Sequence, residues 1–82
     1  MSSFDFSGKR ALVIGGSRGI GKGVTQELVL QGAETFYAAR KPFIDEKGAN
    51  FIQVDVNNEN EIIRLFKKID KGGKIDIVVN TV

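Results

Sequence analysis

The stretch from Lys9 to Gly32, KRALVIGGSRGIGKGVTQELVLQG, predicts the architecture of this chain. It opens with the apolar run Ala11 to Ile14, passes through a glycine-rich turn, and continues with apolar residues at helical spacing. Consecutive apolar residues are typical of a central parallel strand that is covered on both faces. The stretch therefore predicts a strand at Arg10 to Ile14 and, after the turn, a helix over Arg18 to Gln31.

The turn itself, GGSRGIG, carries glycines at the spacing that a phosphate-binding turn needs. Gly15 allows the chain to reverse tightly, Gly19 lets backbone N–H groups approach a pyrophosphate, and Gly21 lets the helix pack close to the strand. The positive end of the helix dipole then faces the anion. Because ten of the 82 residues are glycine, the spacing alone is a weak signal, and the alternative is a glycine turn without a ligand.

The predicted helix after the turn has apolar residues at every fourth position. Ile20, Val24 and Leu28 are expected to share the face that packs on the sheet. Gly32 then supplies a C-terminal stop.

Three further strands are predicted from apolar and β-branched residues, at Glu34 to Ala39, Phe51 to Val56 and Ile75 to Asn80. Between the last two, a second helix is expected to begin after Asn58. The Asn58 side chain would cap this helix, and Glu61 would bond back to Asn58 in a capping box. The apolar face of the helix consists of Ile62, Leu65, Phe66 and Ile69.

This alternation of strands and helices predicts an α/β fold. With right-handed crossovers it gives a Rossmann-like parallel sheet, a partial doubly wound fold with spatial strand order 3-2-1-4. A chain of 82 residues buries only a modest core. We therefore expect one small domain or part of one.

Composition excludes several classes of function. The chain has neither cysteine nor histidine, so we expect no disulfide framework and no transition-metal site. Its 12 basic and 10 acidic residues are spread along the sequence, which is too balanced for a nucleic-acid or membrane surface. With no apolar run long enough to span a membrane, the expected location is cytoplasmic.

The glycine turn and its surroundings resemble the N-terminal part of a short-chain dehydrogenase/reductase. In that family the turn reads T-G-x-x-x-G-x-G, and here Gly15 to Gly21 supplies everything after the threonine, which Ile14 replaces. The resemblance implies that residues 1–82 are the N-terminal part of a single NAD(P)-binding domain. It also implies that Gly15, Gly19, Ile20 and Gly21 surround the diphosphate of the cofactor.

The resemblance further implies a preference for NADP. Arg40 stands where NADP-dependent members keep a basic residue, whereas NAD-dependent members place an acidic residue at the position of Ala39. A guanidinium offers a forked cation to the 2′-phosphate, and a carboxylate would instead bind the ribose hydroxyls. Arg18 is the second such cation, with the Ser17 hydroxyl beside it.

Two more matches to the family follow later strands. Asp55 and Val56 correspond to the residues that contact the adenine ring, and Asn80 is the one residue kept from the family motif N-N-A-G. Simpler interpretations remain open. Arg40 could be a solvated loop cation, Asp55 a turn or strand-end cap, and Asn80 a tie between a strand and a loop.

No catalytic residue is predicted. The family uses a serine and a Tyr-x-x-x-Lys pair on a helix, and these would lie beyond Val82. Tyr37 and Lys41 have that spacing, but along a strand they would be about 13 Å apart, too far for the lysine to act on the tyrosine. We therefore expect the 82-residue chain to be inactive by itself.

The leading hypothesis is an NADP(H)-dependent oxidoreductase acting on a small-molecule carbonyl or alcohol, represented by its dinucleotide-binding half. A second is a non-catalytic NADP(H)-binding module, or one that a partner chain completes. A third is a fragment that binds no ligand. The last strand would leave an unpaired edge, so self-association through that edge is also expected.

Overall fold

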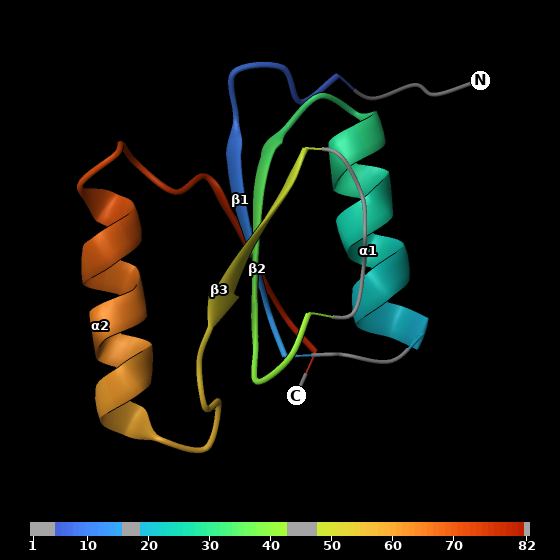
Figure 1. Ribbon diagram of the computed structural model, residues 1–82. Coiled ribbons are helices and arrows are strands. Elements are labelled where there is room, and N and C mark those ends of the chain that lie inside the picture. The colour runs from blue at the N-terminus through green and yellow to red at the C-terminus, as the bar shows by residue number, and fades with distance from the viewer. Residues whose placement is uncertain (1–4, 16–18, 43–47, 82) are drawn as a thin grey trace.

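The computed structural model describes residues 5–15, 19–42 and 48–81. Its helices and strands, in chain order, are β1 (Arg10–Ile14), α1 (Gly19–Leu30), β2 (Glu34–Ala39), β3 (Ala49–Gln53), α2 (Glu59–Asp70) and β4 (Ile77–Asn80). The sheet forms the middle of three layers, with α1 on one face and α2 on the other (Figure 1). The chain therefore alternates between strand and helix, as an α/β fold does.

The strands form one parallel sheet in the order β3-β2-β1-β4. Ile14 at the end of β1 lies opposite Ala38 on one side and Asn80 on the other. The sequence-based prediction of a Rossmann-like sheet with order 3-2-1-4 is confirmed. The predicted bounds of β1 and β2 are also confirmed.

The central strand β1 is buried on both faces. Leu12 and Ile14 belong to the apolar cluster under α2, which includes Leu65 and Ile69 of that helix. Ala11 and Val13 belong to a second cluster on the α1 side, together with Leu28. Successive residues of a strand point to opposite faces, so an uninterrupted apolar run is what two covered faces require.

Helix α1 turns a different face to the sheet from the one predicted. Its buried residues are Gly21, Thr25 and Leu28, whereas Ile20 is 77% exposed. Positions four apart on a helix differ by about 40° in direction, so Ile20 lies about 80° away from Leu28. The shared face predicted for Ile20, Val24 and Leu28 is therefore wrong at its first residue.

The other end of α1 follows the sequence pattern. The helix ends at Leu30, one residue before the predicted end, and Gly32 has a positive φ of 91°. A glycine adopts this left-handed conformation without the steric cost of a side chain. The predicted start at Arg18 lies outside the described residues.

Strand β3 begins and ends earlier than predicted. It covers Ala49–Gln53 instead of Phe51 to Val56. The reason is its neighbour: β2 ends at Ala39, which pairs with Gln53, and only the Val54 N–H reaches back to the Ala39 carbonyl. Strand β4, by contrast, begins later than predicted. It starts at Ile77, two residues after the predicted start, where it first pairs with β1 at Ala11.

Only one of the two hydrogen bonds of the predicted capping box forms at the start of α2. The Asn58 side chain accepts a hydrogen bond from the Glu61 N–H over 3.2 Å. The Glu61 carboxylate does not complete the capping box with Asn58; it accepts instead from the Asp55 N–H over 3.1 Å. Asn58 donates its own N–H to the Asp55 carbonyl, so its N–H is already used. The predicted apolar face is confirmed: Leu65 and Ile69 are buried, and Ile62 and Phe66 are partly buried against the same cluster.

Arg10 connects the start of β1 to the end of α2. Its guanidinium donates to Glu34 Oε1 over 2.7 Å, to the Ile69 carbonyl over 2.9 Å and to the Gly73 carbonyl. It also lies 5.1 Å from the centre of the Phe36 ring. The Arg10 side chain is 13% exposed, so these bonds form a partly buried clamp at the amino edge of the sheet.

Candidate cofactor-binding site

The carboxyl ends of the parallel strands meet at one edge of the sheet, which is the edge where folds of this type bind ligands. Gly15 follows β1 directly and has a positive φ of 74°. Its N–H donates to the Ala38 carbonyl over 2.7 Å, so β2 holds the first residue of the turn in place. Gly15 thus has the left-handed conformation that favours glycine, and residues 16–18 of the expected turn lie outside the described residues.

The chain enters α1 at Gly19, at the same edge (Figure 1). A Cβ added to Gly19 would meet no atom within 4 Å, so there is open space beside this residue. Gly21 is buried, in keeping with close packing of the helix. The first turn of α1 contains no acidic side chain that would neutralise the positive end of the helix dipole. These features are compatible with an anion at this end of the helix. Ser17 and Arg18 lie outside the described residues.

Thr81 supports the base of the turn from the neighbouring strand. Its N–H and its Oγ1 both donate to the Ile14 carbonyl, over 3.0 and 3.1 Å. The Thr81 hydroxyl thus holds the residue that immediately precedes Gly15. Asn80, which precedes Thr81, is exposed at the end of β4, opposite Ile14. The comparison with the N-N-A-G motif pointed to Asn80, but it did not predict the contact of Thr81 with Ile14.

Arg40 and Asp55, which the sequence pattern assigned to different parts of a cofactor, are in contact. The distance from Arg40 Nη2 to Asp55 Oδ1 is 3.4 Å. The two side chains are 67% and 39% exposed, so both are accessible from solvent. Gln53 Nε2 donates to the Arg40 carbonyl over 3.4 Å and ties the residue after β2 to the end of β3.

The turn after β3 holds the Asp55 carboxylate in place. Its Oδ1 accepts from the Asn57 N–H over 3.0 Å, and its own N–H is bound by Glu61. The hydrogen bond from Asn57 is the main cause that lowers the pKa of Asp55. Burial opposes it, and the nearby Arg40 charge lowers the pKa by a smaller amount. Asp55 is therefore an ionised turn residue as well as the neighbour of Arg40. Val56 is partly buried against the cluster under α2.

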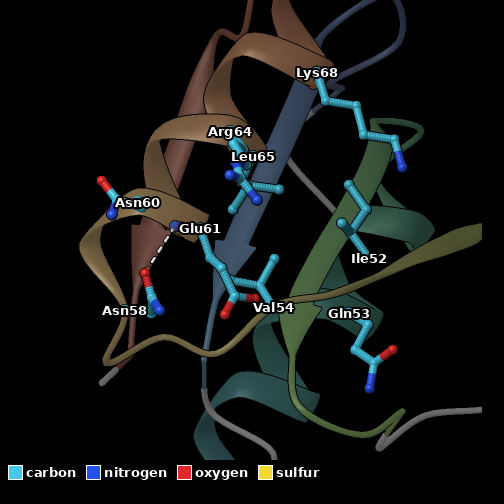
Figure 2. A pocket seen from close by; sticks show the side chains of 9 residues that line it. All are labelled: Ile52, Gln53, Val54, Asn58, Asn60, Glu61, Arg64, Leu65 and Lys68. Carbon is cyan, nitrogen blue, oxygen red and sulfur yellow. Dashed lines mark hydrogen bonds between the residues drawn. The ribbon is translucent and has the colours of Figure 1, made fainter.

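A separate groove of about 390 Å³ runs between β3 and α2 (Figure 2). Ile52, Val54 and Leu65 form its apolar part, and Arg64 and Lys68 contribute cations one helical turn apart. None of the residues predicted to bind the cofactor lines it. Sequence reasoning did not anticipate this groove, because it arises where α2 lies over the edge of the sheet. The nine lining residues are Ile52, Gln53, Val54, Asn58, Asn60, Glu61, Arg64, Leu65 and Lys68.

Over 5–15, 19–42 and 48–81, no three acidic side chains come together as a metal site would need. Neither helix in that part of the chain has the length and apolar character needed to cross a membrane.

The parallel sheet in the order β3-β2-β1-β4, with helices on both faces, defines a Rossmann-like α/β protein. Residues 9–82 match the family described as short chain dehydrogenase, and the chain belongs to that family. It is 36% identical over 88 residues to L-rhamnose 1-dehydrogenase (NADP(+)) of Thermoplasma acidophilum, an alignment that covers 93% of this chain and 35% of that protein. It is 34% identical over 87 residues to 15-hydroxyprostaglandin dehydrogenase [NAD(+)] of Rattus norvegicus, covering 90% and 33%.

The fold agrees with a solved structure of the same family. The crystal structure of 2-keto-3-deoxy-D-gluconate dehydrogenase from Streptococcus agalactiae matches with a TM-score of 0.78 and 31% identity, over 96% of this chain and 34% of that chain. The chain thus spans about a third of the length of these relatives.

Proposed function

We propose that this chain is the N-terminal, dinucleotide-binding part of an NADP(H)-dependent short-chain oxidoreductase that acts on a carbonyl or alcohol. The observation that carries this proposal is the placement of the Gly15 turn, Arg40 and Asp55 at one edge of the sheet, in front of α1. In this proposal residues 1–82 belong to a single domain, and the absence of cysteine fits a cytoplasmic location.

The choice of NADP rests on charge at the end of β2. Arg40 offers an exposed guanidinium there, and Ala39, where NAD-dependent relatives carry an acid, is 4% exposed and has no carboxylate to bind ribose hydroxyls. Arg18 and Ser17 would complete the site around the 2′-phosphate. The two relatives differ in the cofactor that their names state, so the preference is argued from Arg40.

The chain's own residues bind and orient the cofactor. The N–H groups around Gly15 to Gly21 would hold the diphosphate, Asp55 and Val56 the adenine, and Asn80 would border the site at the end of β4. The bound nicotinamide supplies the hydride chemistry. Tyr37 is 2% exposed within β2 and packs on Phe51 with ring centres 5.2 Å apart, which supports its exclusion as a catalytic acid.

Isothermal titration of the chain with NADPH, NADH and 2′,5′-ADP tests the proposal. We expect NADPH and 2′,5′-ADP to bind more tightly than NADH, because only they carry the 2′-phosphate. Equal affinities for NADPH and NADH would refute the roles given to Arg18 and Arg40. Heat from none of the three would support a fragment without a ligand.

Two observations distinguish the oxidoreductase from a non-catalytic or partner-completed module: the coding sequence after Val82 and an assay of hydride transfer. Continuation past Val82 into a Tyr-x-x-x-Lys helix supports the oxidoreductase. Restoration of hydride transfer by a second chain would support partner completion.

A further inference from the structure

The carboxylate of Asp55 occupies a defined position beside Arg40. The Asn57 N–H binds its Oδ1, and Glu61 binds its backbone N–H, so the turn after β3 is held at two points. The Arg40 guanidinium reaches the same Oδ1 over 3.4 Å. A fixed anion therefore already lies against the cation that is proposed to receive a phosphate.

We propose that Asp55 reduces the preference for 2′-phosphorylated cofactors by competing with the 2′-phosphate of the dinucleotide for the Arg40 guanidinium. This inference rests on the proposed function of the site. Without ligand, the carboxylate holds Arg40 at the carboxyl edge of the sheet. When a 2′-phosphate binds, Arg40 must leave Asp55 or share its charge between two anions that repel each other.

The competition affects one class of ligand only. A ligand with a 2′-phosphate meets the Asp55 charge, whereas the same ligand without that phosphate has no second anion near Arg40. Both side chains are exposed, so the effect has the size of a surface ion pair, about two- to fivefold in affinity. Loss of the carboxylate charge would therefore increase the preference for phosphorylated ligands.

The variant Asp55→Asn tests this inference with 2′,5′-ADP and 5′-AMP as probes, which differ by the 2′-phosphate. Asparagine keeps an oxygen that can accept from the Asn57 N–H, and thermal unfolding followed by circular dichroism checks that the turn is preserved. We expect Asp55→Asn to raise the ratio of 2′,5′-ADP affinity to 5′-AMP affinity about two- to fivefold, because any effect on the shared adenine cancels in this ratio. Asp70→Asn is the matched control, since it changes the net charge equally at the far end of α2 and should alter neither affinity.

The double variant Arg40→Gln/Asp55→Asn tests whether Asp55 changes 2′,5′-ADP affinity through Arg40. If Asp55 acts through Arg40, its substitution changes 2′,5′-ADP affinity in the parent chain and has no effect once Arg40 is replaced. An equal gain in both backgrounds would overturn competition at Arg40.

Three other results would also overturn this inference. An equal loss of affinity for both probes in Asp55→Asn would mean that Asp55 acts on the adenine alone, and a larger loss for 2′,5′-ADP would mean that it supports Arg40. Unchanged affinities would mean that it has no role in selectivity. Failure of the unmodified chain to bind either probe overturns the proposed function and this inference together, whereas the first three results leave the proposed function intact.

Discussion

Thr81 donates two hydrogen bonds to the carbonyl oxygen of Ile14, one from its N–H and one from its Oγ1. Ile14 is the last residue of β1 and stands immediately before Gly15. The end of β4 therefore holds the residue from which the glycine turn departs. This contact leads to the first prediction.

Thr81→Val removes the hydroxyl but keeps the shape of the side chain and the backbone hydrogen bond. We expect the free energy of unfolding to fall by about 0.5–1.5 kcal/mol, the net value of one hydrogen bond. Affinity for NADPH and NADH should fall by the same factor, because both carry the diphosphate. Titration calorimetry measures this, and Thr81→Ser should restore binding. Full affinity in the valine variant would contradict the assignment.

Gly15→Ala places a side chain at a φ of 74°. We expect a loss of stability of about 1–2 kcal/mol, because the left-handed conformation is strained for alanine, together with weaker dinucleotide binding. Gly23→Ala is the matched control within α1, where an added Cβ meets nothing within 4 Å. That change should stabilise the chain by about 0.5–1 kcal/mol. Urea unfolding of both variants would reveal opposite shifts in midpoint; shifts of the same sign would argue against this account.

Arg10→Lys keeps the charge of the amino-edge clamp but loses the forked geometry that reaches Glu34, Ile69 and Gly73 together. We expect destabilisation of about 1–3 kcal/mol, because hydrogen bonds of a charged group in a partly buried place are lost. Dinucleotide affinity should not change, since Arg10 lies at the opposite edge of the sheet. Arg64→Lys, at an exposed position of α2, serves as the control for unfolding in urea. Equal midpoints for the two variants would disprove the clamp.

The lowered pKa of Asp55 predicts how the stability of the fold changes at acidic pH. A carboxyl whose pKa is lower in the folded state stabilises the fold above its unfolded pKa of about 3.9, and this stabilisation is lost as the pH falls through the folded value. Thermal unfolding between about pH 2.5 and 6 should therefore show a difference between the parent chain and Asp55→Asn that shrinks as the pH falls. A difference that stays constant with pH would show that the carboxylate charge does not contribute.

Self-association through β4 is the fifth prediction. Strand β4 pairs with β1, and in the described part of the chain no strand covers its other side. Val78, in the middle of β4, is 50% exposed. Apolar sheet edges pair with other chains, and a charge on them opposes this pairing, so Val78→Lys should reduce association of the chain. Size-exclusion chromatography with light scattering measures it; a monodisperse parent monomer that unfolds cooperatively would refute the prediction.

Local patterns in the sequence determined the strand β1, the strand β2, the conformation at Gly15 and the apolar face of α2. The run Ala11 to Ile14 reports two covered faces because side chains alternate along a strand. Gly15 and Gly32 mark turns because each adopts a positive φ. The strand order followed from the alternation of elements and the right hand of their crossovers.

Tertiary structure decided the contacts between segments that are distant in sequence. The clamp joins Arg10 to a carbonyl 63 residues away, and Thr81 reaches Ile14 across 67 residues. The end of β3 depended on where β2 stops, and the exposure of Ile20 on how α1 rotates over the sheet. Arg40 and Asp55 came into contact because parallel strands bring their carboxyl ends to one edge. A pattern within one segment describes that segment's own period, whereas these contacts depend on register and packing between segments.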